Sequence, residues 1–152
     1  MPKLSKQIVL EHRADEVFDL VADIRRYPDF IKWIRSMKVS NERAENGVNY
    51  YRGEADVGFK NFSERFSTDI AADTEARTVE VKLAQGPFKR LRNSWKMTPD
   101  GNLGTVIDFF IDYEFKNPVL SLLARANTSL AVNRIMQAFI DEADRRFGDR
   151  RT

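Results

Sequence analysis

Apolar and polar residues alternate along two segments in the second half of the chain. Residues 91–97 place a leucine, a tryptophan and a methionine on one face, and basic or polar side chains on the other. Residues 107–115 alternate in the same way, with acidic residues on the outer face. A period of two is typical of strands with one buried face. The two segments are predicted to form an antiparallel hairpin, in which basic residues lie opposite acidic ones.

The same pattern continues on both sides of this hairpin. A first strand is predicted over residues 3–11, and a short amphipathic helix with Asp15 and Glu16 in its first turn follows it. Between residues 35 and 115 the pattern indicates one strand after another. The turn signals are Asn46-Gly47, the region of Gly58, residues 73–76, Gln85-Gly86-Pro87 and Asp100-Gly101.

A long helix is predicted at the end of the chain. After Asn117-Pro118 the pattern favours one helix to about Phe147, with Gly148 as its stop. At the standard rise this helix is about 45 Å long, which is enough to cross a whole sheet. Strands followed by one long helix are typical of α+β proteins. We therefore expect a curved antiparallel sheet of about seven strands wrapped around the C-terminal helix, with two short helices after the first strand.

Length and composition fit one domain without disulfide bonds. The chain has 152 residues, of which 42% are hydrophobic and 32% charged, and it has no cysteine. We expect a single domain over residues 1–148 and a disordered tail over residues 149–152. The absence of cysteine excludes thiolate chemistry. The net charge of +2 is too small to indicate DNA binding, and no segment reaches the ~18 apolar residues of a membrane span.

The sequence carries no recognisable catalytic or metal-binding constellation. His12 is the one histidine, and a lone histidine at the end of a strand is more often structural than catalytic. Asp108, Asp112 and Glu114 alternate along one strand, so we interpret them as a solvated ladder rather than a metal site. We expect a binding protein without catalytic residues. A cyclase-type enzyme, which works through the shape of its cavity, is an alternative that would require several convergent polar groups.

The long helix has a face of small and polar residues. At helical spacing this face runs through Leu120, Leu123, Ala124, Asn127, Thr128 and Ala131, and the bulkier Ile135 and Phe139 follow it. A helix with small side chains leaves room under a curved sheet, and ~300–1,000 Å³ is typical of a small-molecule site. The alternative is that aromatic residues of the sheet fill the same space.

Two polar residues fall at inward positions of the predicted strands. Asn93 and Glu64 each lie between large apolar residues. A buried polar group requires a partner, and a buried carboxylate requires one even more. The two side chains could satisfy each other, a backbone group or the polar head of a ligand. For Glu64 the alternative is a bulge that turns the carboxylate to solvent.

Three segments carry recognisable motifs. Residues 27–33 read Tyr-Pro-Asp-Phe-Ile-Lys-Trp, residues 86–95 read Gly-Pro-Phe-Lys-Arg-Leu-Arg-Asn-Ser-Trp, and residues 113–118 read Tyr-Glu-Phe-Lys-Asn-Pro. They resemble the Tyr-Pro-x-Phe-hydrophobic-Pro-Trp signature, the Gly-Pro-Phe-Lys-x-Leu-x-Asn-x-Trp strand and the start of the long helix in the coenzyme Q-binding family of START-like domains. One departure is Lys32, where that family commonly has proline.

The resemblance implies a helix-grip (START/Bet v 1-like) fold with a tunnel under the long helix. It implies a carrier or chaperone of a polyprenylated quinone, ubiquinone, that supports respiratory electron transport without chemistry on the ligand and without a catalytic cofactor. The residues predicted to bind this ligand are Phe30, Trp33, Glu64, Phe66, Leu91, Asn93, Trp95, Phe109, Leu120, Ala124, Thr128 and Ala131.

Relatives of that family suggest two alternatives. Bacterial relatives include ribosome-association toxins that act on the large subunit, and more distant START-like relatives include polyketide cyclases and aromatases. Binding to the ribosome would use dispersed basic residues and would weaken steeply with added salt. These residues are Arg25, Arg26, Lys32, Arg35 and Lys38.

The aromatic segment at residues 27–33 has two interpretations. In the first, Tyr27, Phe30 and Trp33 cap one end of the core. In the second, Phe30 and Trp33 lie at a tunnel mouth on a bilayer, beside Lys32 and Arg35 and aided by Phe59 and Lys60. The sequence shows no lipidation motif. We expect a cytoplasmic protein that binds reversibly to the inner face of the cell membrane.

Overall fold

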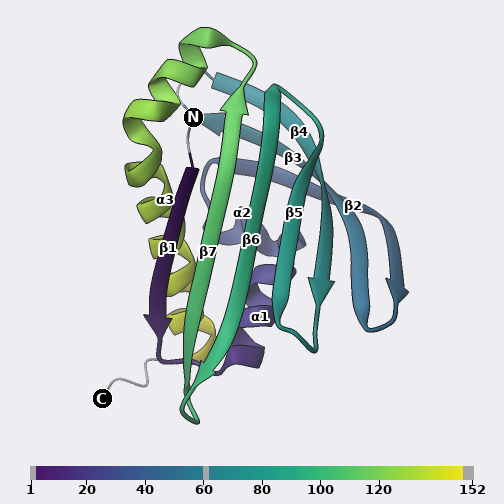
Figure 1. Ribbon diagram of the computed structural model, residues 1–152, viewed down its shortest axis with the longest axis vertical. Coiled ribbons are helices and arrows are strands. Elements are labelled where there is room, and N and C mark those ends of the chain that lie inside the picture. The colour runs from purple at the N-terminus through teal and green to yellow at the C-terminus, as the bar shows by residue number, and fades with distance from the viewer. Residues whose placement is uncertain (1–2, 60–61, 149–152) are drawn as a thin grey trace.

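The computed structural model describes residues 3–59 and 62–148, in which seven strands form one antiparallel sheet. The elements in chain order are β1 (Lys3–Leu10), α1 (Ala14–Ala22), the 3-10 helix η1 (Ile24–Arg26), α2 (Tyr27–Phe30), β2 (Ile34–Glu45), β3 (Val48–Phe59), β4 (Phe62–Asp73), β5 (Thr78–Gln85), β6 (Phe88–Asp100), β7 (Gly104–Phe115) and α3 (Pro118–Phe147). Neighbouring strands follow the order β1-β7-β6-β5-β4-β3-β2. The sheet curves around α3, which runs along one face, and α1 and α2 lie at one end of that face (Figure 1). The predicted α+β helix-grip fold is confirmed.

Local sequence signals account for the turns. Asn46 and Gly47 have φ angles of 54° and 81°, so they form the two-residue hairpin turn between β2 and β3 that the sequence predicts. After β4 the Asp73 carboxylate accepts hydrogen bonds from two backbone N–H groups of the next turn, each at 3.1 Å. The turn predicted in the region of Gly58 is confirmed, because β3 ends at Phe59 and the chain reverses into β4, whose first residue, Phe62, pairs with Phe59. Within β3, a Cβ atom at Gly58 would lie 2.8 Å from the guanidinium carbon of Arg35, so a larger residue there would displace the end of this flexible side chain.

The helix α3 begins and ends as the sequence predicts. The side chain of Asn117 accepts hydrogen bonds from the backbone N–H groups of Val119 and Leu120, at 2.8 and 3.4 Å. Pro118 occupies the first turn, where a missing N–H group costs nothing. Gly148 ends the helix with φ of 81°. The 30 residues of α3 make it long enough to pass both ends of the sheet.

The hairpin of β6 and β7 pairs opposite charges on its outer face, as predicted. The guanidinium of Arg90 lies 3.0 Å from carboxylate oxygens of both Asp112 and Glu114. The hydrogen bond from Arg90 holds the pKa of the Glu114 carboxyl below its usual value. These carboxylates therefore belong to a ladder of ion pairs across two strands.

Strand β2 forms one edge of the sheet, and its pairing with β3 is interrupted. The register shifts between Ser40 and Arg43. Asn41, inside this break, has φ of 55°, a left-handed conformation that asparagine tolerates better than most residues. Beyond it the Arg43 guanidinium lies 4.4 Å from the ring centre of Tyr50. The bulge bends the strand where it leaves the body of the sheet.

Candidate functional site

Side chains on the inner face of the sheet change from buried to partly exposed along the central strands. We call the strand ends beside α1 the lower end and those where α3 begins the upper end (Figure 1). On β7, Ile107 and Phe109 are 1% and 4% exposed, whereas Tyr113, nearer the upper end, is partly exposed. On β6, Trp95 is 4% exposed and Leu91, nearer the upper end, is partly exposed. The lower end is therefore a closed core, and water reaches the inner face of the upper end.

The partly exposed side chains form one apolar surface, which we call the upper concave surface. Its members are Phe66, Leu83, Leu91, Tyr113 and Phe115. The buried ring of Phe88 supports it, with ring centres 5.4 Å from Phe66 and 4.7 Å from Phe115. Edge-to-face and stacked contacts of this kind hold aromatic rings in defined positions. The upper concave surface is thus an ordered aromatic platform.

The first half of α3, residues 118–131, passes over this surface with small side chains. Ser121 and Thr128 are buried and Ala124 is partly exposed. The hydroxyl of Thr128 donates to the Ala124 carbonyl at 2.6 Å. Because the Thr128 hydroxyl uses its one proton in this bond, its oxygen accepts a hydrogen bond from the Tyr113 hydroxyl, 2.9 Å away. The Tyr113–Thr128 hydrogen bond therefore joins this half of α3 to β7. The small side chains of the helix leave the aromatic platform incompletely covered.

Glu64 lies on the inner face at the upper end, as the sequence predicts. Strands β3 and β4 pair without a register shift, so no bulge turns its side chain to solvent. The side chain is partly buried beside Phe66 of the upper concave surface. No hydrogen bond or ion pair reaches it from the described residues. The Glu64 carboxyl group therefore lies at the edge of the platform, where it can form a hydrogen bond with a polar group of a ligand.

Asn93 already has partners within the protein. Its amide nitrogen donates to the Phe110 carbonyl at 2.8 Å, and its amide oxygen accepts from the indole N–H of Trp95 at 2.7 Å. The second of these bonds fixes the orientation of a core tryptophan. Asn93 and Glu64, which could have satisfied each other, form no contact of that kind.

Three predicted ligand contacts lie elsewhere than expected. Trp95 and Phe109 belong to the core, because the ring of Phe139 in α3 lies 5.0 Å from Trp95 and closes the space above them. Ala131 is exposed, as are Leu123 and Asn127 of the same predicted helix face, so the prediction that these three face the sheet is wrong. The inward face of α3 runs instead from Thr128 to Val132, because four residues bring a helix back to nearly the same direction.

The aromatic segment before β2 caps the core, which was the first of its two interpretations. Phe30 lies 5.8 Å from the Tyr27 ring and 5.2 Å from the Phe139 ring. Trp33 is partly buried against the core, and its carbonyl accepts a hydrogen bond from the N–H of Gly58 at 2.8 Å. Both rings keep partial exposure, so contact of this segment with a bilayer stays a prediction. The Phe59 side chain, Lys60 and the tail over residues 149–152 lie outside the described residues.

The sequence predictions missed Leu83, Tyr113 and Phe115 as site residues. Alternation along residues 107–115 did indicate that Tyr113 and Phe115 point inward, so a signal for them existed. Leu83 continues the alternation of Val79 and Val81 along β5, so a signal for it existed as well; the register shift between β4 and β5 comes after it.

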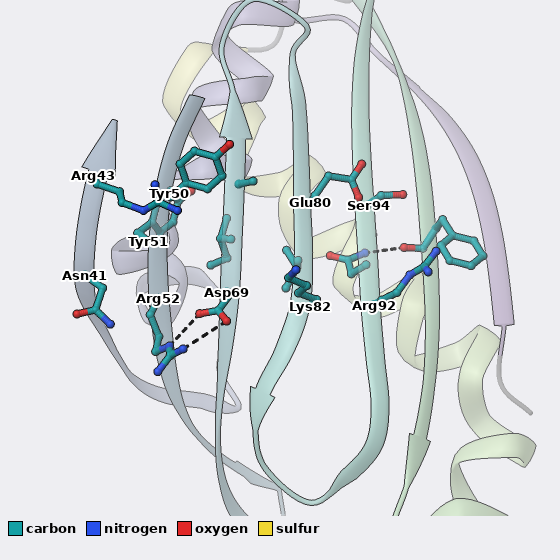
Figure 2. A pocket seen from close by; sticks show the side chains of 15 residues that line it. Asn41, Arg43, Tyr50, Tyr51, Arg52, Asp69, Glu80, Lys82, Arg92 and Ser94 are labelled. Carbon is teal, nitrogen blue, oxygen red and sulfur yellow. Dashed lines mark hydrogen bonds and ion pairs between the residues drawn. The ribbon is translucent and has the colours of Figure 1, made fainter. Parts of the chain in front are cut away.

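A separate hollow of about 650 Å³ lies on the outer face of the sheet, away from α3 (Figure 2). Figure 2 shows the side chains of Arg52 and Asp69 meeting across it, with N–O distances of 2.8 and 3.3 Å. Lys82 and Arg92 extend from β5 and β6 along the same wall (Figure 2). These ionised groups would lose hydration under an apolar ligand, so the hollow does not suit one.

Two tyrosine hydroxyls tie the end of α1 to the body of the fold. Tyr51 donates to the Ala22 carbonyl at 2.6 Å, and Tyr27 donates to the Val21 carbonyl. Burial raises the pKa of Tyr51 to about 12 and that of Tyr27 above its ordinary value. Both phenols therefore stay protonated, and they act as donors that hold the lower end together.

A buried carboxylate forms ion pairs within the last turns of α3. Glu142 is 4% exposed and accepts hydrogen bonds from Arg145 at 2.7 and 2.8 Å and from Arg146. The hydrogen bonds from Arg145, and then those from Arg146, lower the pKa of Glu142 to about 2. The buried ring of His12 contacts Asp144 at 2.7 Å, so the one histidine has a structural partner.

The described residues show neither a metal-binding cluster nor a membrane-spanning helix. Over residues 3–59 and 62–148, no group of three or more His, Cys, Asp or Glu side chains is arranged to hold a metal ion. No helix in this part of the chain is long and apolar enough to cross a membrane.

Comparison with known proteins places the chain among its relatives. Ribosome association toxin RatA of Escherichia coli K12 is 29% identical over 140 residues, which is 91% of this chain and 85% of the toxin. Coenzyme Q-binding protein COQ10 homolog B of Xenopus laevis is 29% identical over 147 residues, 95% of this chain and 59% of that protein. The solution structure of the 18 kDa protein CC1736 from Caulobacter crescentus is 35% identical, with a TM-score of 0.82 over 98% of this chain and 100% of that one. Residues 10–140 match the family described as polyketide cyclase/dehydrase and lipid transport, and the chain belongs to that family.

Proposed function

We propose that the protein binds a lipophilic small molecule, a polyprenylated quinone such as ubiquinone, between the upper concave surface and the first half of α3. It carries the quinone in support of respiratory electron transport and performs no chemistry on it. The observation that carries this proposal is the change along β6 and β7 from a closed core to an aromatic platform that water can reach.

The driving force for binding is burial of this platform. Apolar surface removed from water contributes about 25 cal/mol per Å², and an isoprenoid tail offers apolar surface along its whole length. Phe66, Leu91 and Phe115 present flat or branched side chains to such a tail. Ser121 and Ala124 on the helix side leave room for it.

The polar head of a quinone has a matching donor in Tyr113. In the free protein its hydroxyl donates to Thr128, whose oxygen is also bonded through its own proton to Ala124. The Tyr113 proton can turn to a quinone carbonyl while Thr128 keeps its bond to the backbone. The name of the COQ10 relative, which refers to coenzyme Q, supports a quinone as the ligand.

An enzymatic role receives less support from the same surface. A cyclase needs several convergent polar groups around its substrate. Around the upper concave surface, Glu64 and Tyr113 are the described titratable side chains. One carboxyl and one phenol suit the recognition of a ligand better than proton transfer at several positions.

Association with the ribosome is a second candidate, because the RatA relative is as similar as the COQ10 relative. The basic residues predicted for it are partly neutralised. Arg25 pairs with Glu42 at 3.0 Å, Arg26 with Asp29 at 3.6 Å and Arg35 with Asp56 at 2.7 Å. Such pairs reduce the positive field that attracts RNA phosphates, so we favour the quinone.

Titration of the purified protein in detergent with ubiquinone tests the proposal. The variant Ala124→Trp should fold and weaken binding at least about tenfold, because its indole occupies the space above the platform. Ala126→Trp is the matched control, since Ala126 is exposed on the same helix, and it should bind normally.

Normal ubiquinone binding by Ala124→Trp would show that the ligand lies elsewhere. Absence of binding in the parent, together with co-sedimentation with large ribosomal subunits that added salt abolishes, would establish the second candidate instead.

A further inference from the structure

The first half of α3 carries a second apolar face, which points away from the sheet. Among the described residues six large hydrophobic side chains are strongly exposed, and four of them lie on this half-helix. Val119 is 65% exposed, Leu122 68%, Leu123 48% and Leu130 52%. We call these four residues the outer apolar face.

Helical geometry places these residues on one side of α3. Spacings of three, four and eleven residues return to nearly the same direction in a helix, so the four side chains form a continuous stripe. The buried residues Ser121 and Thr128 lie on the opposite side. Single exposed leucines are ordinary, but a contiguous apolar stripe on one element indicates a contact with another body.

The charged residues within this segment of the chain are all positive, and Glu114 on β7 is an acidic residue that interacts electrostatically with one of them, Arg125. Residues 116–134 contain Lys116, Arg125 and Arg134 and no aspartate or glutamate, in a chain with 23 acidic residues. All three cations are exposed, and none forms an ion pair with a described residue. The next turns of α3, by contrast, carry Asp141, Glu142 and Asp144. Apolar side chains with cations and without carboxylates thus occupy one continuous segment.

We propose that the outer apolar face docks the protein on a bilayer that contains anionic lipids. The leucines would enter the boundary between headgroups and acyl chains, and the long stems of Arg125 and Arg134 would let their guanidinium groups reach lipid phosphates. A second copy of the chain fits less well, because a two-fold contact through the same face would oppose like charges. RNA would neutralise the cations and leave the leucines in water.

Docking in this orientation has a consequence for the ligand, which rests on the proposed function. The half-helix that would contact the bilayer is the one that covers the upper concave surface (Figure 1). A quinone that leaves the bilayer would therefore meet the upper end of the sheet first. A carrier of a ligand that is nearly insoluble in water gains from loading at the membrane itself.

Vesicle flotation tests the docking surface. The parent should float with vesicles of phosphatidylcholine and phosphatidylglycerol in equal parts and much less with phosphatidylcholine alone. Leu122→Gln/Leu123→Gln should weaken partition at least about tenfold, since two exposed leucines no longer leave water. Val9→Gln/Leu103→Gln is the matched control, because these residues are 62% and 54% exposed outside α3, and it should float like the parent.

Three results would overturn the docking proposal. The first is no flotation of the parent with anionic vesicles, and the second is equal flotation of the two double variants. The third is a parent that sediments as a dimer while Leu122→Gln/Leu123→Gln sediments as a monomer, which would assign the face to a second copy. Ubiquinone titration of the same variant in detergent separates the two proposals, because quinone binding should be retained whether or not docking is lost.

Discussion

In the second half of α3, Val132, Met136 and Phe139 lie against the sheet and are almost fully buried. In the first half, Ser121 and Thr128 take their place, and the aromatic side chains beneath stay partly exposed. The backbone is one uninterrupted helix in both halves. The difference arises from side-chain volume, which decides whether the same helix seals the sheet or leaves a surface for another molecule.

The outer side of α3 shows the reverse distribution: it is polar in the second half and apolar in the first. The half with the bulky inner residues has a polar outer side, with Gln137 and Asp141 joined by a hydrogen bond of 2.8 Å. The half with the small inner residues has leucines outside. Burial therefore stabilises the protein mainly through the second half of α3. The first half has partly exposed apolar residues of the sheet beneath its inner side and exposed leucines on its outer side.

The largest expected effect is on the stability of the lower end. Phe139→Ala should lower the free energy of unfolding by about 3–5 kcal/mol, because a buried ring that contacts Trp95, Tyr27 and Phe30 leaves a cavity. Phe115→Ala removes the same side chain from the upper concave surface and should cost only about 1–2 kcal/mol, since that ring is partly exposed. Urea unfolding of both variants measures the difference, and equal losses would contradict the division of α3.

A smaller effect is expected at Asn93, which lies between the two ends on β6. Asn93→Leu should lower the free energy of unfolding by about 1–3 kcal/mol, because the Trp95 indole and the Phe110 carbonyl both lose a partner. Urea unfolding and ubiquinone titration should be measured on the same sample. Unchanged stability with weakened quinone binding would move Asn93 from the core to the ligand site.

The smallest effect is expected in acid. The folded pKa of Glu142 is lowered to about 2, so the stability it contributes is complete above its unfolded pKa and is lost as the pH falls through the folded value. Between about pH 5 and 2 the free energy of unfolding of the parent should fall by about 1–2 kcal/mol more than that of Glu142→Gln. This value is reduced for solvent screening, because the side chain of Arg145 is exposed. Parallel pH curves for the two proteins would contradict this role of the ion pair.

The strands and the helix boundaries could be predicted because each follows from local rules. Alternation along residues 91–97 and 107–115 places the β6–β7 hairpin, and Asn46-Gly47 adopts the two positive φ angles that its turn requires. Asn117, Pro118 and Gly148 set the ends of α3. None of these features depends on contacts between distant parts of the chain.

The rotation of α3 and the roles of polar residues could not be predicted in this way. The first half of the helix has small residues on its inner side and leucines on its outer side, so its hydrophobic periodicity does not show which side faces the sheet, and Leu123, Asn127 and Ala131 were misplaced for that reason. The partners of Asn93 lie on its own strand and on β7, and a buried amide accepts such partners as readily as a ligand.

The break in β2 affects how the protein behaves in crowded solution. An edge strand with a regular row of free N–H and C=O groups is a template on which another chain can add a strand, the first step of many aggregates. At Asn41 the left-handed backbone interrupts that row, and the register with β3 resumes only at Arg43. A strand from another molecule would find hydrogen-bonding partners on either side of the bulge but no continuous ladder across it. The irregular edge thus protects a curved, open sheet from self-association along its rim.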